Sequence, residues 1–462
     1  MLFSFFFTTL FADKLTNEVV KDTTFVIVSK IILEGNKITK DNIILRELQI
    51  KEGDTIFTIY LTDRIKKSTE NVMNTSLFNF VTITPELDAD NGVKIIIKLI
   101  ERWYIWPIPN LDLADRNFNT WWKTKALNRV NYGIDLTTNN FRGRKETLEL
   151  LFSLGYDENY GFLYTIPYLD KKKTIGMNLS AGVTLNHEVA LTSVNNKIVF
   201  FKQEDIYLKK QIYSTLGFTF RRNIHNTHTF NISYFDYIFA DTLLKLNKDY
   251  SINQKSNTNF ISLSYQFKRD YRDYKSYPLT GSYFDINITK SGLGILNNED
   301  LNNYIVESTV RKYWKLDQRF YFATGLTVMT SSASPYFIEN GLGYGRDYIR
   351  SYEYYVINGQ SFGLLKTNFK YNLIPPKVKK INFVKTDKFN TIPYAFYVNL
   401  FADAGYVKSN ENVSLNPLTN QFLIGGGIGL DFVTYYDMVI RVEYSINKEG
   451  EHGIFINFMT SI

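Results

Sequence analysis

Hydrophobic and polar residues alternate with a period of two along many short segments between residues 129 and 462. In one of them, Ile261 and Leu263 alternate with Ser262 and Ser264. Successive side chains of a β-strand point to opposite faces, so the pattern predicts strands that separate an apolar from a polar environment. A soluble β-sandwich would show the same alternation, and the pattern alone leaves both architectures open.

The number of such segments favours a membrane barrel. Most have roughly the 9–11 residues that a tilted transmembrane strand needs. An even strand number, with short turns and long loops, is typical of closed bacterial barrels. We therefore predict a mainly β protein with a 16-stranded antiparallel transmembrane β-barrel over residues 129–462. The expected strands are 129–136, 145–155, 160–168, 174–184, 196–203, 210–221, 227–237, 258–269, 280–290, 303–315, 319–331, 361–373, 391–403, 421–433, 437–446 and 452–460.

Residues 24–103 show the pattern of a small α/β unit instead. A turn signal, Gly35-Asn36, follows a β-branched run, and Thr39 is placed to cap a helix. Asp90-Asn91-Gly92 is a hairpin signal between two later strands. Two helices on a three-stranded sheet would leave one edge free to receive a strand from another chain. The expected elements are a strand over 25–33, helices over 40–48 and 58–74, and strands over 80–87 and 93–101.

Two further segments flank this unit. Residues 1–12 are apolar and end in a small residue, which we interpret as the remnant of a signal peptide, with a buried first strand as the alternative. Residues 104–128 are interpreted as a connector. The tryptophans in and beside it suit either a membrane–water interface or packing beneath the α/β unit, and they are Trp103, Trp106, Trp121 and Trp122.

Composition excludes several other classes of protein. Aromatic residues make up 16% of the chain, whereas the mean hydropathy is only -0.20, which fits strands better than membrane helices. Without cysteine there is no disulfide framework or thiol chemistry, and the net charge of +7 contains no basic run that would indicate nucleic-acid binding. The four histidines show no metal-ligand spacing, and 425–431 (GGGIGLD) precedes no helix that would hold a phosphate. We expect no metal, no cofactor and no enzymatic activity.

A barrel of about sixteen strands encloses a lumen wide enough for water unless something fills it. Residues 332–360, between the eleventh and twelfth expected strands, are the best candidate. Gly341, Gly343 and Gly345 permit unusual backbone angles, and Arg350 lies among tyrosines on which its planar cation would stack. We predict an inward loop, with an ordinary extracellular loop as the alternative. The tyrosines concerned are Tyr348, Tyr352, Tyr354 and Tyr355.

Asp403 is the expected partner of Arg350. It lies in the run Phe401-Ala402-Asp403-Ala404-Gly405, in the phase of the strand that faces the lumen. An inward loop could bring the Arg350 guanidinium to this carboxylate, and such a fork fixes geometry. From spacing alone, two unrelated solvated charges are the favoured interpretation.

Two groups of motifs carry a resemblance to a known family. Residues 33–56 and 75–87 resemble a POTRA domain, the polypeptide-transport-associated module of outer-membrane assembly and secretion proteins, through Gly35, Asn36, Thr39, Glu47, Gly53, Leu77 and Phe78. The loop resembles the inward loop of the BamA/TamA superfamily, whose core is Val/Ile-Arg-Gly-Tyr/Phe. Here the core reads Ile349-Arg350-Ser351-Tyr352, with serine in the place of glycine.

Further runs extend this resemblance over about residues 24–462. The Phe-x-Asp-x-Gly strand motif of the superfamily is matched by Phe401, Asp403 and Gly405, and its aspartate is implied to meet the loop arginine. The other similar runs are 140–144, 164–168, 270–273 with Pro278 and Gly281, and 425–430.

The resemblance implies insertion of barrels into the bacterial outer membrane or translocation of polypeptide across it, with the POTRA domain in the periplasm. The implied partners are unfolded outer-membrane or secreted polypeptides, outer-membrane lipid, and periplasmic chaperones or accessory assembly proteins. We expect a client strand to enter the seam between 129–136 and 452–460, near Tyr132 and Ile456, where Gly133 and Gly453 weaken pairing. A dedicated secretion pore for one partner protein and a passive porin are the alternatives.

Overall fold

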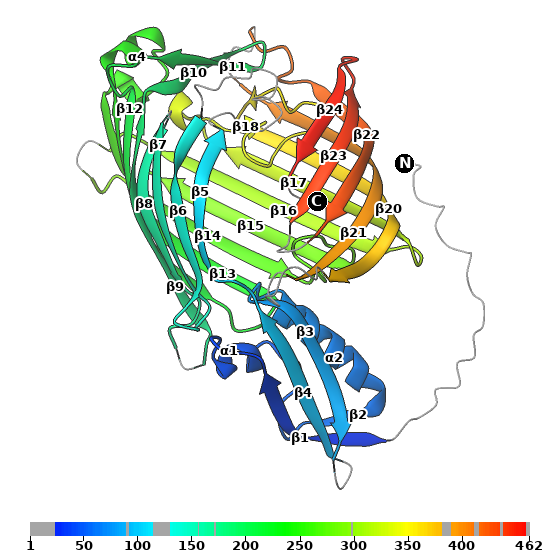
Figure 1. Ribbon diagram of the computed structural model, residues 1–462. Helices are drawn as coiled ribbons and strands as arrows, with labels where there is room; N and C mark the ends of the chain where they lie inside the picture. Colours follow the sequence, from blue (N-terminus) through cyan, green and yellow to red (C-terminus); the bar gives the residue numbers. More distant parts are fainter. Residues whose placement is uncertain are drawn as a thin grey trace, which may run out of the picture.

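The structure, a computed structural model, shows a small α/β domain at one end of a large barrel (Figure 1). It describes residues 24–88, 92–113, 130–155, 157–170, 172–296, 299–380, 390–410, 415–434 and 438–458. The interpretation of residues 1–12 as a signal peptide falls outside the described residues, as do Trp121, Trp122 and the hairpin residues Asp90 and Asn91.

The α/β domain is a four-stranded sheet with two helices. The strand order is β2-β1-β4-β3, and β1 and β4 run parallel. The sequence pattern predicts only three of these strands, because β2 has three residues, too few to show an alternation. The elements are β1 (Phe25–Glu34), α1 (Asp41–Leu45), β2 (Thr55–Phe57), α2 (Thr58–Met73), β3 (Phe78–Leu87) and β4 (Gly92–Glu101).

Apolar side chains from both helices and one face of the sheet form the core of this domain. Ile44, Val72, Phe78 and Ile97 are fully buried there. Burying a side chain of this size stabilises the fold by roughly 1.5–3 kcal/mol. The α/β domain therefore has a hydrophobic core of its own, separate from the barrel.

Thr39 does not cap α1, contrary to expectation. The residue before the helix is Lys40, and no side chain caps the helix. The Thr39 hydroxyl is instead buried, where it donates to Oε1 of Glu101 at 2.7 Å and accepts from Nδ2 of Asn140 at 2.9 Å. Asn140 belongs to the barrel, so Thr39 helps to join the two parts.

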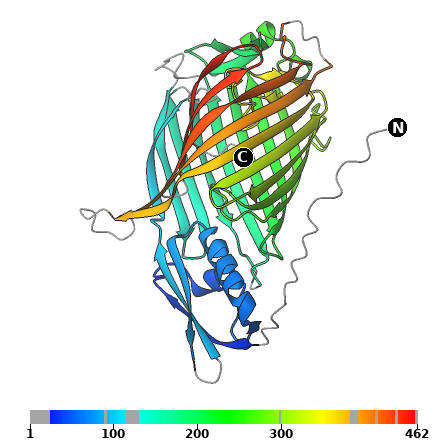
Figure 2. The same cartoon turned by 90° about the vertical axis from the view of Figure 1, so that its right-hand side faces the viewer.

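Sixteen strands form one antiparallel sheet, which confirms the predicted fold class. Figure 2 shows the strands running obliquely around the wall. In sheet order they are β24 (His452–Asn457), β23 (Val439–Asn447), β22 (Phe422–Val433), β21 (Thr391–Lys408), β20 (Ser361–Lys380), β17 (Phe320–Ser331), β16 (Asn303–Lys315), β15 (Gly281–Ser291), β14 (Asn257–Asp270), β13 (Asn226–Phe239), β12 (Lys209–Phe220), β9 (Ile175–Asn186), β8 (Asp157–Ile166), β7 (Glu146–Gly155), β6 (Val130–Phe141) and β5 (Ile105–Leu113).

Two segments of the chain were assigned wrongly. Residues 105–113, expected in the connector, form the first barrel strand β5, which pairs with β6. Residues 196–203, expected in the wall, contain β11 (Lys197–Lys202), which pairs with β10 (Glu188–Val194) in a separate hairpin. The prolines of β5 interrupt its alternation, whereas β11 alternates without being part of the wall. The two errors cancel, and the total of sixteen is unchanged.

As expected, apolar side chains of the wall strands face outward and polar side chains face the lumen. On β23, Val442 and Tyr444 are exposed on the outer surface, whereas Arg441 and Glu443 point inward and are each 1% exposed. An apolar outer band faces lipid in a membrane barrel. Polar side chains this deeply buried require a covering structure inside the lumen. In the described part of the chain, no helix is long and apolar enough to cross a membrane.

The α/β domain docks on the short turns at one end of the barrel, here called the domain end. Glu47, beside α1, accepts from Arg221 of the β12–β13 turn at 2.9 Å and from the Tyr168 hydroxyl at 3.1 Å. Burial alone would raise the pKa of Glu47, but Lys145 and Arg221 outweigh it and lower the pKa to about 2. The opposite, far end carries the longer loops, with β10, β11 and α4 (Asp241–Leu246).

Candidate functional site

The loop between β17 and β20 starts at the far end and folds into the lumen. It contains a turn of 3-10 helix, η2 (Tyr336–Ile338), and two short strands, β18 (Gly341–Leu342) and β19 (Ile357–Asn358). These two strands pair only with each other among the described residues, so side-chain contacts rather than a ladder hold the loop to the wall. Ile349, Arg350 and Val356 are completely buried.

Arg350 uses all of its guanidinium donors in contacts with the wall. Nε donates to Oδ2 of Asp403 at 2.7 Å, and Nη2 donates to Oδ1 at 2.5 Å, which gives the expected fork. The second Nη2 proton is donated to the Thr367 carbonyl at 3.0 Å. Nη1 donates to Asn368 at 2.6 Å and to Glu443 at 3.4 Å. A guanidinium has five N–H donors, and each has an acceptor here.

The ring beneath the Arg350 cation belongs to the wall and not to the loop. Its guanidinium carbon lies 3.9 Å from the ring centroid of Phe401, where the sequence suggested tyrosines of the loop. Tyr348 instead stacks under another cation, with Nζ of Lys366 at 4.3 Å from its ring. Both arrangements are cation–π contacts that are strongest where water is excluded.

The remaining residues expected around this pair give the loop its fit against the wall. Tyr352 is buried in a cluster that includes Ile349 and Val407. A Cβ atom on Gly405 would lie 2.6 Å from the Ile349 side chain, so glycine makes room for the loop. The structure therefore brings Arg350, Asp403, Tyr352, Phe401 and Gly405 together.

Ser351 lies where the superfamily motif has glycine, and its backbone explains the preference. Its φ is +77°, in the left-handed region that disfavours a side chain. Across from it, a Cβ atom on Gly425 would lie 2.1 Å from the Arg350 carbonyl oxygen. Gly425 thus allows the loop backbone to approach β22 closely, and the run 425–431 is a wall strand rather than a phosphate loop.

Sequence reasoning missed a second polar cluster, nearer the domain end. Nε of Arg441 donates to Oδ1 of Asp431 at 2.7 Å, Asn399 donates to the same oxygen at 2.9 Å, and the Tyr277 hydroxyl donates to Oδ2 at 2.7 Å. Together the loop and the wall bury four basic and four acidic side chains. They are Arg350, Lys366, Lys370, Arg441, Glu353, Asp403, Asp431 and Glu443.

The loop also contacts the last strand of the sheet through its tyrosines. The Tyr348 hydroxyl donates to Asn457 of β24 at 3.5 Å, and the ring of Tyr354 lies 5.5 Å from that of Phe455. Just before β24, Glu451 accepts from the Tyr355 hydroxyl at 2.7 Å. The aromatic residues of the loop therefore connect the filled lumen to one end of the sheet.

The seam does not lie where the sequence placed it. The sheet ends at β5 and β24, and no ladder joins these two strands among the described residues. Tyr132 and Gly133 belong to β6, the second strand, where they pair with Leu111 and Asn110 of β5. Gly453 and Ile456 are on β24, at the seam as expected. The correction follows from β5, which the sequence pattern assigned to the connector.

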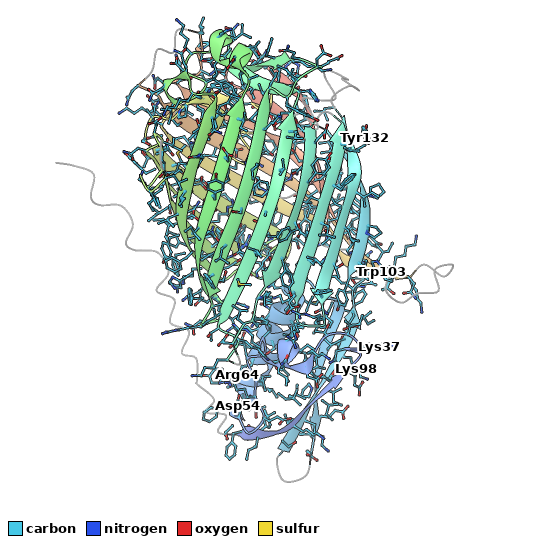
Figure 3. All side chains as sticks on the ribbon, turned by 90° about the vertical axis from the view of Figure 1, so that its left-hand side faces the viewer. Lys37, Asp54, Arg64, Lys98, Trp103 and Tyr132 are labelled. Carbon is cyan, nitrogen blue, oxygen red and sulfur yellow. The ribbon has the colours of Figure 1, made fainter. Side chains whose placement is uncertain are left out.

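Aromatic residues mark the two ends of the first strands. Figure 3 shows Trp103 near the domain end and Tyr132 toward the far end of the wall. Nε1 of Trp106 donates to the Trp103 carbonyl at 3.0 Å, and Trp103 is 45% exposed. Half-exposed indole rings at this level fit a membrane–water interface.

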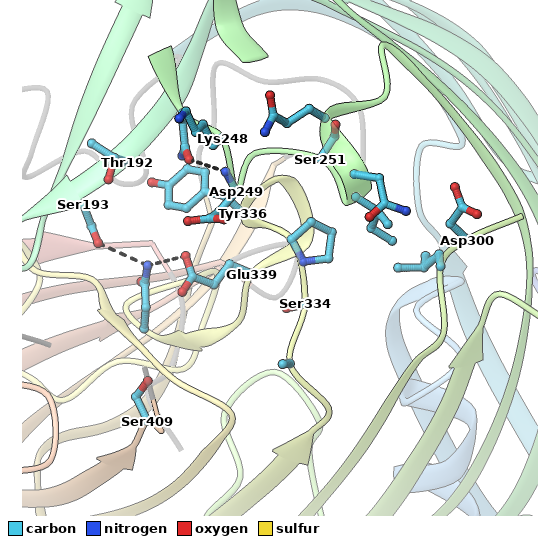
Figure 4. Close-up of a pocket in the computed structure, with 18 of the residues that line it drawn as sticks. Thr192, Ser193, Lys248, Asp249, Ser251, Asp300, Ser334, Tyr336, Glu339 and Ser409 are labelled. Atoms are coloured by element: carbon cyan, nitrogen blue, oxygen red, sulfur yellow. Dashed lines mark hydrogen bonds between the residues drawn. The ribbon is translucent and has the colours of Figure 1, made fainter. Parts of the chain in front are cut away.

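A polar cavity of about 1050 Å³ opens at the far end beside the inward loop (Figure 4). Asn358 of the loop crosses it, donating to Glu339 at 2.6 Å and to Ser193 of the β10–β11 hairpin at 3.2 Å. Its other walls carry mainly amides and hydroxyls, among them Asn253, Ser334 and Thr419. Within the described ranges, no group of three or more His, Asp or Glu side chains could hold a metal ion.

Comparison with known proteins identifies both parts of the chain. Residues 26–102 match a POTRA model, described as a surface antigen variable number repeat, and residues 140–458 match the Omp85 superfamily domain. No curated protein matches the chain.

Two solved structures show a similar fold. One is BamA from Haemophilus ducreyi lacking POTRA domains 1–3, at 16% identity and a TM-score of 0.50, covering 94% of this chain and 83% of that one. The other is CdiB from Escherichia coli, at 10% identity and a TM-score of 0.51, covering 97% of this chain and 91% of that one. The barrel accordingly lies in the outer membrane, with the POTRA domain in the periplasm.

Proposed function

The chain belongs to the Omp85 superfamily, and on that premise we propose that it passes unfolded polypeptides into the outer membrane through the seam between β5 and β24. The superfamily as a whole works in outer-membrane protein insertion or secretion. The observation that carries the narrower proposal is that no ladder joins β5 to β24 among the described residues, beside a lumen that is filled by the inward loop.

The POTRA sheet supports a first step in which the client is captured as a strand. Strands β2 and β3 are the edges of that sheet, and an edge strand offers a row of unpaired backbone groups. Beside β2, Phe57 and Tyr60 are more than half exposed and their rings pack edge to face. Backbone pairing with the edge and contact with these rings would hold an extended apolar segment without reading its sequence.

The seam supports a second step in which the client strand pairs with β24. β24 has six residues, whereas its neighbour β23 has nine, so the last strand offers few ladder bonds to be replaced. A backbone group without a hydrogen-bond partner costs several kcal/mol in lipid. A client strand that forms a ladder with β24 is therefore favoured over one that enters the membrane alone. No bond-making or bond-breaking chemistry is needed, and we propose no catalytic residue.

Cysteine crosslinking tests the seam directly, because the chain contains no cysteine of its own. Single cysteines along β5 are combined with Ile454→Cys on β24, and the pair that oxidises fastest is used. Insertion of a barrel client into vesicles should stop when the pair is oxidised and recover on reduction. A disulfide between Leu111→Cys and Tyr132→Cys, at paired positions of β5 and β6, is the matched control. Full insertion with the β5–β24 pair oxidised would remove the proposal.

A dedicated secretion pore is the second candidate function. It is favoured by the way in which the inward loop is attached to the wall. No ladder joins β18 or β19 to the wall strands in the described part of the chain, so the loop can leave the lumen without breaking the wall sheet. In that case the crosslinked seam would still allow export of a partner protein. Disulfides that fix the loop to the wall would block export.

A further inference from the structure

The turn between β14 and β15, residues 271–280, lies at the domain end and contacts the POTRA domain. Asn74, the residue that caps the C-terminus of α2, donates from Nδ2 to the Asp273 carbonyl at 2.8 Å. The backbone N–H of Lys275 donates back to Oδ1 of Asn74 at 3.2 Å. One side chain of the POTRA domain thus binds two backbone groups of this turn.

The same turn reaches into the lumen through Tyr277. This tyrosine is 4% exposed, and its hydroxyl donates to Asp431 at 2.7 Å. Nζ of Lys370 lies 4.3 Å from its ring centroid, and the ring of Tyr397 lies 4.8 Å away. Hydrogen bonds to a charged group are among the stronger ones in proteins. Tyr277 is therefore anchored to the wall by its ring and its hydroxyl together.

These anchors belong to a distant part of the wall. Lys370, Tyr397 and Asp431 are on β20, β21 and β22, which are three to five strands away from β15 in the sheet. A turn that simply joined β14 to β15 would stay beside those two strands. This one crosses part of the barrel mouth and covers the wall cluster from the periplasmic side.

The turn is internally stiff, so a displacement at one end is transmitted to the other. Arg272 forms a fork with Asp270 at 2.8 and 2.7 Å. The Asp273 carboxylate accepts from the backbone N–H groups of Tyr274, Leu279 and Thr280 at 2.9–3.2 Å. Asp273 is also the residue whose carbonyl binds Asn74, which places the stiffening group at the POTRA contact.

We propose that residues 271–280 act as a latch that links the position of the POTRA domain to closure of the lumen. While the POTRA domain is docked, Asn74 holds the turn and Tyr277 stays on Asp431. When the domain moves away, the hydrogen bonds between Asn74 and the turn break. Tyr277 then leaves Asp431, and the periplasmic mouth of the barrel opens. This regulation rests on the proposed function, because an opening set by the POTRA domain is useful only if that domain delivers a client.

A thiol placed behind the latch reports its opening without any client. Ala395 is buried in the cluster that contains Tyr277, and Ala395→Cys introduces the only thiol of the chain. The full-length barrel is reconstituted in vesicles, and a water-soluble maleimide is added from the POTRA side. Tyr277→Phe keeps the ring and removes only the hydrogen bond to a charged acceptor, so it should raise the labelling rate about tenfold.

The POTRA side of the latch is tested with Asn74. Asn74→Ala should raise the labelling rate of Ala395→Cys nearly as much as Tyr277→Phe does, and the double variant should add little to either. Asn74→Asp keeps the acceptor for Lys275 and should give an intermediate rate. Tyr274→Phe, on the same turn but 43% exposed, is the matched control and should leave the rate unchanged.

The outcomes separate the latch from the proposed function. If Tyr277→Phe raises labelling and both Asn74 variants leave it at the wild-type rate, the link to the POTRA domain is wrong. If neither change has an effect, the turn is not a latch. Rates that rise as expected would support the latch even if the seam crosslink left insertion intact, since labelling uses no client.

Discussion

Two buried arginine–carboxylate pairs join parts of this molecule that are distant in sequence, and their surroundings differ. Arg350 and Asp403 are completely enclosed, and every donor of the guanidinium has an acceptor. Glu47 and Arg221 join the POTRA domain to a turn, and the Arg221 side chain is 20% exposed. The first pair holds a loop inside the barrel, and the second holds a domain against its end.

The difference in exposure makes one contact harder to break than the other. Breaking the Arg350–Asp403 pair leaves an uncompensated charge in a dry site, which is strongly unfavourable. Water can replace the partners of Arg221 as the POTRA domain departs, so the cost of separation is lower. We infer that docking of the POTRA domain is the easier of the two contacts to reverse, and the following predictions test this order.

The largest effect is expected at the inward loop. Arg350→Ala or Asp403→Ala should each lower the free energy of unfolding of the barrel by about 3–5 kcal/mol, because the remaining charge is buried without its partner. Urea unfolding in lipid vesicles measures this. The double variant should cost clearly less than the sum of the two. Arg311→Ala, on β16 and only partly buried, is the control, and an equal loss there would contradict a special role for the pair.

A smaller effect is expected at the POTRA junction. Glu47→Gln removes the charge that faces Arg221 and should weaken docking by about 1–3 kcal/mol. Spin labels at Lys66 on α2 and Lys315 at the end of β16 report docking through the width of their distance distribution. Asp63→Asn removes an exposed pair with Lys67 and should change little. A distribution as narrow in Glu47→Gln as in the wild type would contradict this prediction.

Docking should also depend on pH through the same carboxylate. The pKa of Glu47 is about 2 when docked and returns toward its ordinary value of 4.5 when the domain leaves. A depressed pKa stabilises the docked state fully above pH 4.5, and that stabilisation is lost as the pH falls toward 2. The distance distribution of the same spin labels should therefore broaden over this range. Broadening that is identical in Glu47→Gln would show that another group is responsible.

The smallest effect is expected at Ser351. Its left-handed backbone disfavours a side chain, so Ser351→Gly should stabilise the loop by up to about 1 kcal/mol. The same unfolding measurement detects it, with Ser445→Gly on β23 as a control that should not stabilise. A loss of stability in Ser351→Gly would mean that contacts of the serine side chain outweigh the backbone strain.

The wall could be predicted from sequence because its chemistry repeats every two residues. The prediction failed at two segments in which alternation and membership of the wall do not go together. Proline interrupts the pattern in β5, and the β10–β11 hairpin alternates although it stands outside the wall. The position of the seam followed the first of these errors, which placed Tyr132 and Gly133 at the end of the sheet, although they lie on its second strand.

The candidate site was predictable to the level of its central pair. A motif predicted Arg350 and Asp403, whereas Asn368 on β20, which also accepts from Arg350, was not predicted. The sequence does not tell whether the aromatic ring that stacks on Arg350 comes from the loop or from the wall. The answer depends on how deeply the loop enters the lumen. Tyr277 had no signal at all, since a turn that crosses the barrel mouth leaves no periodic pattern.

Planar-bilayer conductance of the purified barrel tests most directly whether Arg350 and Asp403 hold a filled lumen closed. Wild type is compared with Arg350→Ala, Asp403→Ala and the double variant. The account predicts a low wild-type conductance, a similar increase or instability in both single variants, and little further change in the double variant. A steady open pore in the wild type that neither change alters would contradict it and would favour a porin-like function.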